Sequence, residues 1–396
     1  MSKEQLTKKH YYTFLLASFV GLLLLAAYAS YILWIHNKVG DPELYITKNL
    51  QACNQDEYKN RCLKKAAADF LNHLKLTEIL PILRKNEKTE AYFRACHQLA
   101  HYLGQYEYGR VKSVTSVYAT ADETCSGGIY HGTIEGYFME RKIIFDGTPE
   151  TDKKISTEIS RVCGKENEHE RINEYGNCVH GLGHALMYVT DNDLVRALKL
   201  CDYVESEWYQ GICYTGALMQ NYNSFGDVDH PSLYVKIDDP LYPCYILEKR
   251  YQPRCYSYGV LTNFQQYPEK SVALCEKIPR EYARACFKTY GVDRSIVGFS
   301  PTVIKSQCGL VKDFEFRADC INESAGHLVS RFGLESTLGA ELCSLEDIKN
   351  QYACYSLLIV TAKTLTRNLQ TLSTFCKQIP DRTMEECLRT FTVQRE

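Results

Sequence analysis

Residues 273–287 read Ala-Leu-Cys-Glu-Lys-Ile-Pro-Arg-Glu-Tyr-Ala-Arg-Ala-Cys-Phe, and the same plan returns at residues 342–355 and 375–388. Each stretch holds two cysteines that are separated by a short polar segment. If the first cysteine ends one helix and the second lies about two turns into the next, the two can face each other across a helical hairpin. The pattern therefore predicts helix-turn-helix units, each closed by one disulfide bond.

These units recur along the chain. Between residues 213 and 387 the second cysteine of each pair returns every 31 to 34 residues, with one interval of 42. A period of this length is typical of stacked helical hairpins, and because one hairpin cannot bury its apolar face alone, its neighbours must pack on it. We therefore expect an all-α fold, with an N-terminal transmembrane helix followed by a disulfide-stapled α-solenoid of helix-turn-helix repeats.

The pattern resembles the general class of helical-hairpin repeats, the tetratricopeptide and Sel1-like solenoids, some of which carry a disulfide in every hairpin. The resemblance covers about residues 155–396 and rests on the period, the cysteine placement and a small residue after the second cysteine. These small residues are Gly216, Gly259, Gly291 and Gly326. The tetratricopeptide consensus of Trp, Leu, Gly, Tyr, Ala and Pro is not matched, so the resemblance implies an architecture and no activity.

The cysteines also indicate the compartment. The chain has 18 of them, an even number that divides into nine sequential pairs, and it contains no Cys-x-x-Cys. That absence argues against zinc ribbons, thioredoxin-like redox sites and c-type haem attachment. These regular pairs follow an N-terminal apolar segment that is typical of an export signal, and this favours disulfides over reduced structural cysteines. One pairing, of residues 96 and 125, stays open because its loop is by far the longest. The expected pairs are Cys53–Cys62, Cys96–Cys125, Cys163–Cys178, Cys201–Cys213, Cys244–Cys255, Cys275–Cys286, Cys308–Cys320, Cys343–Cys354 and Cys376–Cys387.

The export signal lies near the N-terminus, where residues 12–35 contain no charged side chain. A helix of that length extends about 36 Å, which spans a bilayer with some tilt. Lysines precede this stretch, so the positive-inside rule places the N-terminus in the cytoplasm and the main domain outside, in a periplasmic, lumenal or extracellular space. A cleaved signal peptide is the alternative, because Ala27-Tyr28-Ala29 is similar to a cleavage site, but the apolar run continues to Ile35 and favours an uncleaved anchor.

The expected organisation therefore has four parts. They are a cytoplasmic tail (1–11), a transmembrane signal anchor (12–36), an N-terminal helical unit with a histidine-rich site (45–195) and helical-hairpin repeats (196–396). The overall composition, with 45% hydrophobic and 24% charged residues, is that of a globular protein. A net charge of -2 gives no global attraction to nucleic acid, so we expect no nucleic-acid partner.

Three segments between residues 96 and 187 each place two metal-capable side chains four residues apart, soon after a cysteine. On a helix such residues lie on one face about 6 Å apart, so both can reach one ion. With 11 histidines in the chain, about 0.3 His pairs at this spacing are expected by chance, and two occur. The candidate ligands are His97, His101, His131, Glu135, His180 and His184.

The repeat itself does not require these histidines. Gly176-Asn-Cys178-Val-His180 aligns with Gly211-Ile-Cys213-Tyr-Thr215, so threonine occupies the position of a histidine one unit later. Histidine at these positions is therefore a property of the N-terminal units alone.

Two functions fit this pattern. In the first, the six residues bind a transition metal (Zn, Fe, Mn or Cu), with Glu135 as a ligand or catalytic general base, and the protein is a metal-dependent hydrolase or oxidoreductase. In the second, the histidines are hydrogen-bonded core groups, and the protein is a non-enzymatic envelope scaffold that binds a protein or glycan through its tyrosine-rich surface. The metal hypothesis requires donor atoms within about 5 Å of a common point.

Overall fold

The computed structural model describes residue 20 and residues 40–392, except for 88, 94, 123, 142–147, 166–171, 225–230, 237, 259–260, 262–266 and 367. In this part of the chain the regular elements are helices, with no β-strand, so the predicted all-α class is confirmed. The predicted membrane anchor (12–36) lies outside the described residues apart from Val20, as does Gly259. None of the described helices has the length and apolar character needed to cross a membrane.

Six hairpins share one construction. The first cysteine stands at or next to the end of the first helix, and the second cysteine is the seventh residue of the second helix. This is the placement that the repeat predicted. The hairpins are α9 (Pro149–Cys163) with α10 (Ile172–Val189), α11 (Leu194–Cys201) with α12 (Glu207–Asn223), α14 (Pro268–Cys275) with α15 (Arg280–Val297), α16 (Pro301–Cys308) with α17 (Phe314–Phe332), α18 (Leu338–Ser344) with α19 (Ile348–Leu365), and α20 (Leu369–Cys376) with α21 (Asp381–Thr392).

The remaining described helices depart from this plan. In the N-terminal part they are α2 (Pro42–Gln55), α3 (Lys59–His73), α4 (Leu76–Asn86), α5 (Glu90–Phe93), α6 (Cys96–Val111), α7 (Val114–Tyr118) and α8 (Gly128–Arg141). Between α12 and α14 the longer interval of the repeat holds the short helices η2 (Cys244–Ile246) and α13 (Gln252–Ser257). The insertion therefore shortens one hairpin and does not interrupt the order of the units.

Local sequence signals explain where several helices begin. The side chains of Asp193, Ser206, Asp313 and Asn368 accept hydrogen bonds from the first backbone N–H groups of α11, α12, α17 and α20. Such caps satisfy donors that have no partner inside the helix. Proline is the first residue of α2, α9, α14 and α16, where its missing N–H costs nothing.

All 18 cysteines are disulfide-bonded in the nine sequential pairs, which confirms the predicted pairing. The Cα atoms of the bonded pairs are 5.3 to 5.8 Å apart, within the usual range. Cys96–Cys125, which the sequence left open, has a different role from the others. It joins the first residue of α6 to the loop before α8 and closes no hairpin.

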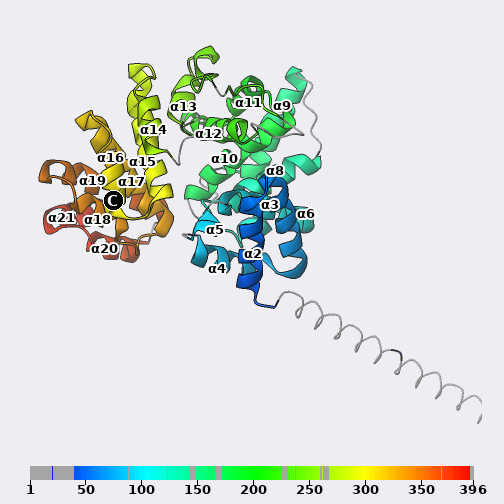
Figure 1. Cartoon of the computed structure of the whole chain (residues 1–396), viewed down its shortest axis with the longest axis horizontal. Coiled ribbons are helices and arrows are strands. Elements are labelled where there is room, and N and C mark those ends of the chain that lie inside the picture. The colour runs from blue at the N-terminus through cyan, green and yellow to red at the C-terminus, as the bar shows by residue number, and fades with distance from the viewer. Residues whose placement is uncertain are drawn as a thin grey trace, which may run out of the picture.

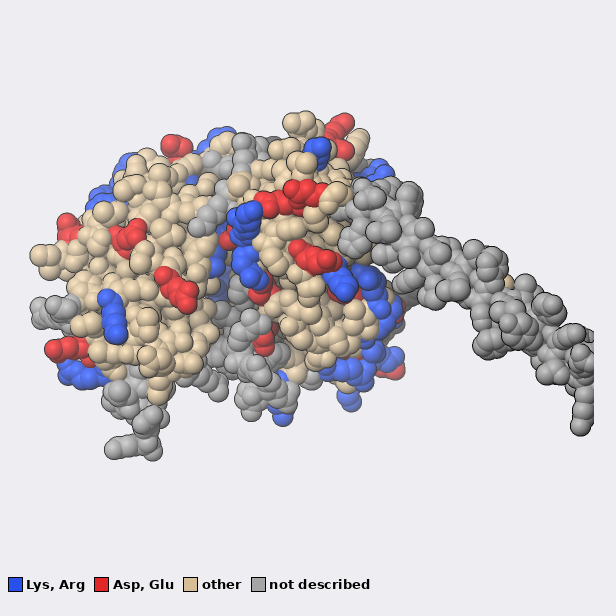
Figure 2. Space-filling view, turned by 90° about the horizontal axis from the view of Figure 1, so that it is seen from below, with Lys and Arg blue, Asp and Glu red and all other residues tan. Residues whose placement is uncertain are grey.

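The chain does not extend as an open solenoid, in which each unit touches only its neighbours. Helices α14–α21 lie at the left of Figure 1 and α2–α12 at the right, and α19 returns to pack against α10. On α17, the Arg331 Nε lies 3.9 Å from the Glu87 carboxylate at the end of α4. The C-terminal units are therefore in contact with the histidine-bearing part of the chain. On the face seen in Figure 2, acidic and basic side chains are interspersed, in keeping with the small net charge.

Candidate metal centre

The three predicted pairs lie on three helices that pack side by side. His97 and His101 are on α6, His131 and Glu135 on α8, and His180 and His184 on α10. Helix α8 packs between α6 and α10, and α10 packs in turn on α12. The spacing prediction is therefore correct for all three segments, and the order of the helices brings the three faces together.

Glycines set the distance between these helices. A Cβ atom built on Gly132 of α8 would lie 1.8 Å from the carbonyl oxygen of His101, and one on Gly181 of α10 would lie 2.8 Å from the Cα of His131. On α12, a Cβ on Gly216 would lie 2.0 Å from the carbonyl oxygen of His180. Any side chain at these positions would push the helices apart. Each histidine-bearing turn thus rests directly on a glycine of the next helix.

The six predicted side chains converge in the interior. Glu135, His101, His131 and His184 are buried, and the other two histidines are half-buried. Three groups each have ligand atoms within 4.8 Å of one another, which meets the convergence that the metal hypothesis requires. The groups are His97, His101 and His131; His131, His180 and His184; and His101, Glu135 and His184.

Hydrogen bonds on the outer side of the first pair determine where its protons lie. His97 Nδ1 is 2.8 Å from the carbonyl oxygen of Cys125, and His101 Nδ1 is 2.8 Å from Glu135 Oε1. Both oxygens are acceptors, so each Nδ1–H donates to its oxygen. The Nε2 atom of each ring is then an unprotonated nitrogen with a lone pair. These two Nε2 atoms are 3.1 Å apart.

The second pair repeats this arrangement. His180 Nδ1 is 3.1 Å from Thr215 Oγ1, whose own proton goes to the Ile212 carbonyl, so the hydroxyl accepts from the imidazole. His184 Nδ1 lies 3.0 Å from the amide oxygen of Gln220. Again both Nδ1–H groups donate outward. The two Nε2 lone pairs face each other at 3.2 Å.

His131 lies between the two pairs and belongs to a group with each. Its Nδ1 is 3.3 Å from His101 Nε2, and its ring is tilted against His180 with centroids 4.7 Å apart. Its Nε2 is buried and has no hydrogen-bond partner among the described residues. Buried polar atoms are nearly always paired, so this nitrogen indicates a missing partner.

Glu135 stands behind the imidazoles and not between them. Its Oε1 accepts from His101 Nδ1 and lies 3.7 Å from His184 Nδ1, and its Oε2 accepts from the Gln105 amide. Burial raises the pKa of this carboxyl, and the neighbouring His184 and Gln105 oppose the rise. A carboxylate in this position fixes the tautomer and orientation of a metal-binding histidine.

Burial keeps the five histidines neutral. It lowers the pKa of His101 and of His184 to about 3, and burial together with the neighbouring His101 lowers the pKa of His97 to about 4. The pKa values of His131 and His180 are lowered well below the ordinary value by burial and by adjacent histidines. At neutral pH no imidazolium is therefore available to place a proton between the facing nitrogens.

Three residues that support the cluster through hydrogen bonds, one to Glu135 and two to histidines, were not predicted from the sequence. Gln105 follows His101 by four residues on α6, and Thr215 and Gln220 lie on α12 opposite the second pair. Thr215 occupies the position of His180 in the aligned repeat, which could have identified it. The glutamines carry no comparable signal, because polar side chains on a helix usually face solvent.

His327 serves as a comparison within the same fold. Its Nδ1 is 2.8 Å from Ser295 Oγ, whose proton goes to the Val292 carbonyl, so it has the same kind of outward hydrogen bond as His180. It belongs to none of the metal-sized groups found among the described residues. A half-buried histidine is thus tolerated in this fold without a cluster around it.

No family model, curated protein or solved structure matches the chain.

Proposed function

We propose that the histidine cluster binds one or two transition-metal ions, and that the protein is an extracytoplasmic metalloprotein held at the membrane by its N-terminal segment. The observation that carries this proposal is the facing of two Nε2 lone pairs in each histidine pair, at 3.1 and 3.2 Å. Two nitrogens that each bind one ion at about 2.1 Å are about 3.0 Å apart at a right angle and about 3.4 Å apart at the tetrahedral angle. Both observed separations fall in this interval.

A proton shared between the facing nitrogens is the alternative, and for His101 and His184 donating this proton is unfavourable. His101 could donate from Nε2 only if its Nδ1 gave up its proton, and the Nδ1 lone pair would then face the Glu135 oxygen at 2.8 Å. The same shift in His184 would turn its Nδ1 lone pair toward the amide oxygen of Gln220. Each shift replaces a hydrogen bond by a contact between two acceptors in a buried place. A metal ion bound between the rings would satisfy the lone pairs without these changes.

The ligand atoms narrow the choice of metal. All the converging atoms except the Glu135 oxygen are imidazole nitrogens. Imidazole suits Zn, Cu and Fe, whereas Mn prefers carboxylate and water ligands. We therefore propose Zn, Cu or Fe, and place Mn last among the metals that the sequence suggested.

Each pair, together with His131, would supply three nitrogen ligands to one ion, and a site with three protein ligands would still accept water or substrate. Such a metal would supply Lewis-acid or redox chemistry, and we propose a hydrolase or oxidoreductase on that ground. Because both oxygens of Glu135 are engaged on the outer side of the rings, we assign it the orientation of His101 and not the role of general base. The chain's own contribution is to hold neutral imidazoles in a fixed orientation.

Cobalt binding tests this proposal. Co²⁺ added to metal-free protein should give visible absorption bands of nitrogen coordination, which saturate at one or two equivalents. The His97→Ala/His180→Ala variant should lose these bands, because it removes one ligand from each pair. The control is His327→Ala, which removes a half-buried histidine outside the cluster and should retain these bands. Bands that persist in the double variant, or that vanish equally in the control, would refute the cluster as the metal site.

A further inference from the structure

A cavity of about 500 Å³ lies where the C-terminal units meet the N-terminal part of the chain. One wall comes from the end of α4 and the loop before α8, and the opposite wall comes from the end of α17, from α19 and from α20. Its size is that of a binding site for a small molecule. Apolar side chains (Phe332, Leu334 and Leu365) line it together with two arginines and three carboxylates.

The charged group of greatest interest in this wall is Arg331. Its side chain is only 8% exposed, yet its Nε and Nη1 atoms have no hydrogen-bond partner among the described residues. Among the described residues Glu87 has the nearest carboxylate, but at 3.9 Å it is too distant for a hydrogen bond. The guanidinium also lies 4.9 Å from the centre of the Phe299 ring, a contact that holds a cation without using its N–H donors. A buried guanidinium with unused donors needs an acceptor.

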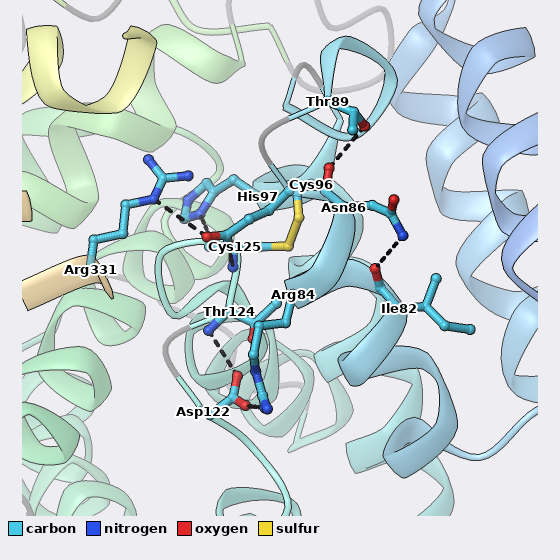
Figure 3. The surroundings of a disulfide bond; sticks show 11 residues. Ile82, Arg84, Asn86, Thr89, Cys96, His97, Asp122, Thr124, Cys125 and Arg331 are labelled. Carbon is cyan, nitrogen blue, oxygen red and sulfur yellow. Dashed lines mark hydrogen bonds and ion pairs between the residues drawn. A yellow bond between two sulfur atoms is a disulfide. The ribbon is translucent and has the colours of Figure 1, made fainter. Parts of the chain in front are cut away.

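The same arginine is close to the metal centre. Figure 3 shows its guanidinium beside His97, and Arg331 is among the charged groups that act on this imidazole. Glu87 also connects the two places, because its Oε2 accepts from the Cys125 N–H while the Cys125 carbonyl accepts from His97 Nδ1. The wall of the cavity and the support of one proposed ligand are thus the same few residues.

We infer that this cavity binds a small molecule through its oxyanion, which is a carboxylate or a phosphate and pairs with Arg331. By this anion a substrate would be held beside the metal centre. The second half of this inference rests on the proposed function. Arginine is suited to the role because its planar fork of donors matches the two oxygens of either anion. The apolar side chains of the cavity would contact the remainder of the molecule. Glu87 competes for the same guanidinium, which makes it a useful site for a test.

The first test measures anion binding in the metal-free protein by calorimetry. The probes are benzoate and phenylphosphonate, which share one apolar body and differ in the anion, and benzamide is the neutral control. We expect at least one of the two anions to bind and benzamide not to bind. The anion that binds more tightly indicates whether the natural ligand carries a carboxylate or a phosphate. Arg331→Gln should weaken binding about tenfold or more, because it removes a charge-assisted pair. Arg84→Gln is the matched control, since Arg84 lines the same cavity but is 60% exposed and paired with Asp122, and it should change affinity less than about twofold.

Glu87→Gln is a variant that should gain affinity, a result that misfolding cannot explain. It removes the competing charge but keeps an oxygen that can accept from the Cys125 N–H, so the affinity for the anion should rise severalfold. Binding by Arg331→Gln as tight as wild type, or no binding of either anion by any variant, would overturn the cavity as an anion site.

The second test asks whether the anion lies beside the metal centre. With Co²⁺ in the protein, the phosphorus signal of phenylphosphonate should broaden in wild type and remain sharp with His97→Ala/His180→Ala. If the anion binds through Arg331 and Co²⁺ does not bind at all, the proposed function fails and the anion site stands. If both bind and the signal stays sharp, the cavity is separate from the metal centre and its assignment to the substrate is refuted.

Discussion

At the scale of single residues, the hydrogen bonds behind the imidazoles decide what the cluster can do. His180 owes its Nε2 lone pair to Thr215, which accepts the proton of its Nδ1. Thr215→Val keeps the shape and removes the acceptor, so His180 is free to take the other tautomer. We expect metal affinity to fall about 10- to 100-fold in a chelator competition, as is typical when such a partner is lost. Thr289→Val is the control, because Thr289 bonds only the carbonyl one turn before it on α15. Equal affinities of the two variants would contradict the role of Thr215.

The histidines also make stability depend on pH. In the unfolded chain a histidine titrates near its ordinary pKa of about 6.5, whereas the folded pKa is about 4 for His97 and about 3 for His101 and His184. Between these values the unfolded state holds more protons. The metal-free protein should therefore keep its stability above about pH 6.5 and lose it progressively as the pH falls toward 4. The raised pKa of Glu135 favours the folded state at lower pH, but it is a single group, whereas the five histidines of the cluster all act in the other direction.

Urea unfolding of the metal-free protein at pH 7 and pH 5 measures this effect. The midpoint should be lower at pH 5, and the difference should shrink in His97→Ala/His180→Ala, which lacks two of the titrating groups. If the double variant shows the same pH dependence as wild type, groups outside the cluster are responsible.

At the scale of helices, the glycines of α10 provide a comparison within one element. A Cβ on Gly181 would lie 2.8 Å from the Cα of His131, whereas a Cβ on Gly176 would meet only the end of the Ile212 side chain at 3.9 Å. Gly181→Ala should destabilise the protein by about 1–3 kcal/mol and abolish metal binding, because α10 must move away from α8. Gly176→Ala should retain the metal and be neutral or more stable by up to about 1 kcal/mol. Equal effects of the two substitutions in thermal unfolding would show that helix contact is not the cause.

The disulfides can be compared in the same way. Cys96–Cys125 ties the first turn of the His97 helix to the carbonyl that holds His97, whereas Cys376–Cys387 joins the last hairpin. Replacing either pair by serine should cost about 2–4 kcal/mol of stability. Metal affinity should fall only when the first pair is removed, which a chelator competition on the two variants measures. An equal loss of affinity would indicate a general loosening of the fold.

The helices and their pairing could be predicted from the sequence because they depend on local signals. The position of Cys286 as the seventh residue of α15, and the caps at Asp193 and Ser206, follow from a few neighbouring residues. The spacing of His180 and His184 likewise predicts a shared face. The tautomers could not be predicted, because they depend on Glu135 and Gln220 lying behind the rings, and this follows from how α8 and α12 pack on α10.

At the scale of the whole molecule, the return of α19 to α10 was not expected from the repeat. Nothing in the local pattern specifies it, because the accumulated rotation between successive units sets the direction of a solenoid. This return places Arg331 within 3.9 Å of Glu87 although 244 residues separate them in the sequence. A composite cavity and the histidine cluster therefore lie close together, although their residues come from distant parts of the chain.

The metal content of the purified protein tests the central claim most directly. The full chain is produced in an oxidising compartment, offered Zn, Cu and Fe, freed of loosely bound ions and measured by mass spectrometry beside His97→Ala/His180→Ala and the His327→Ala control. We predict one to two equivalents of a transition metal in wild type and control, and none in the folded double variant. Less than a tenth of an equivalent in every sample, with all three folded, would contradict a metal centre and leave a cluster of neutral core histidines.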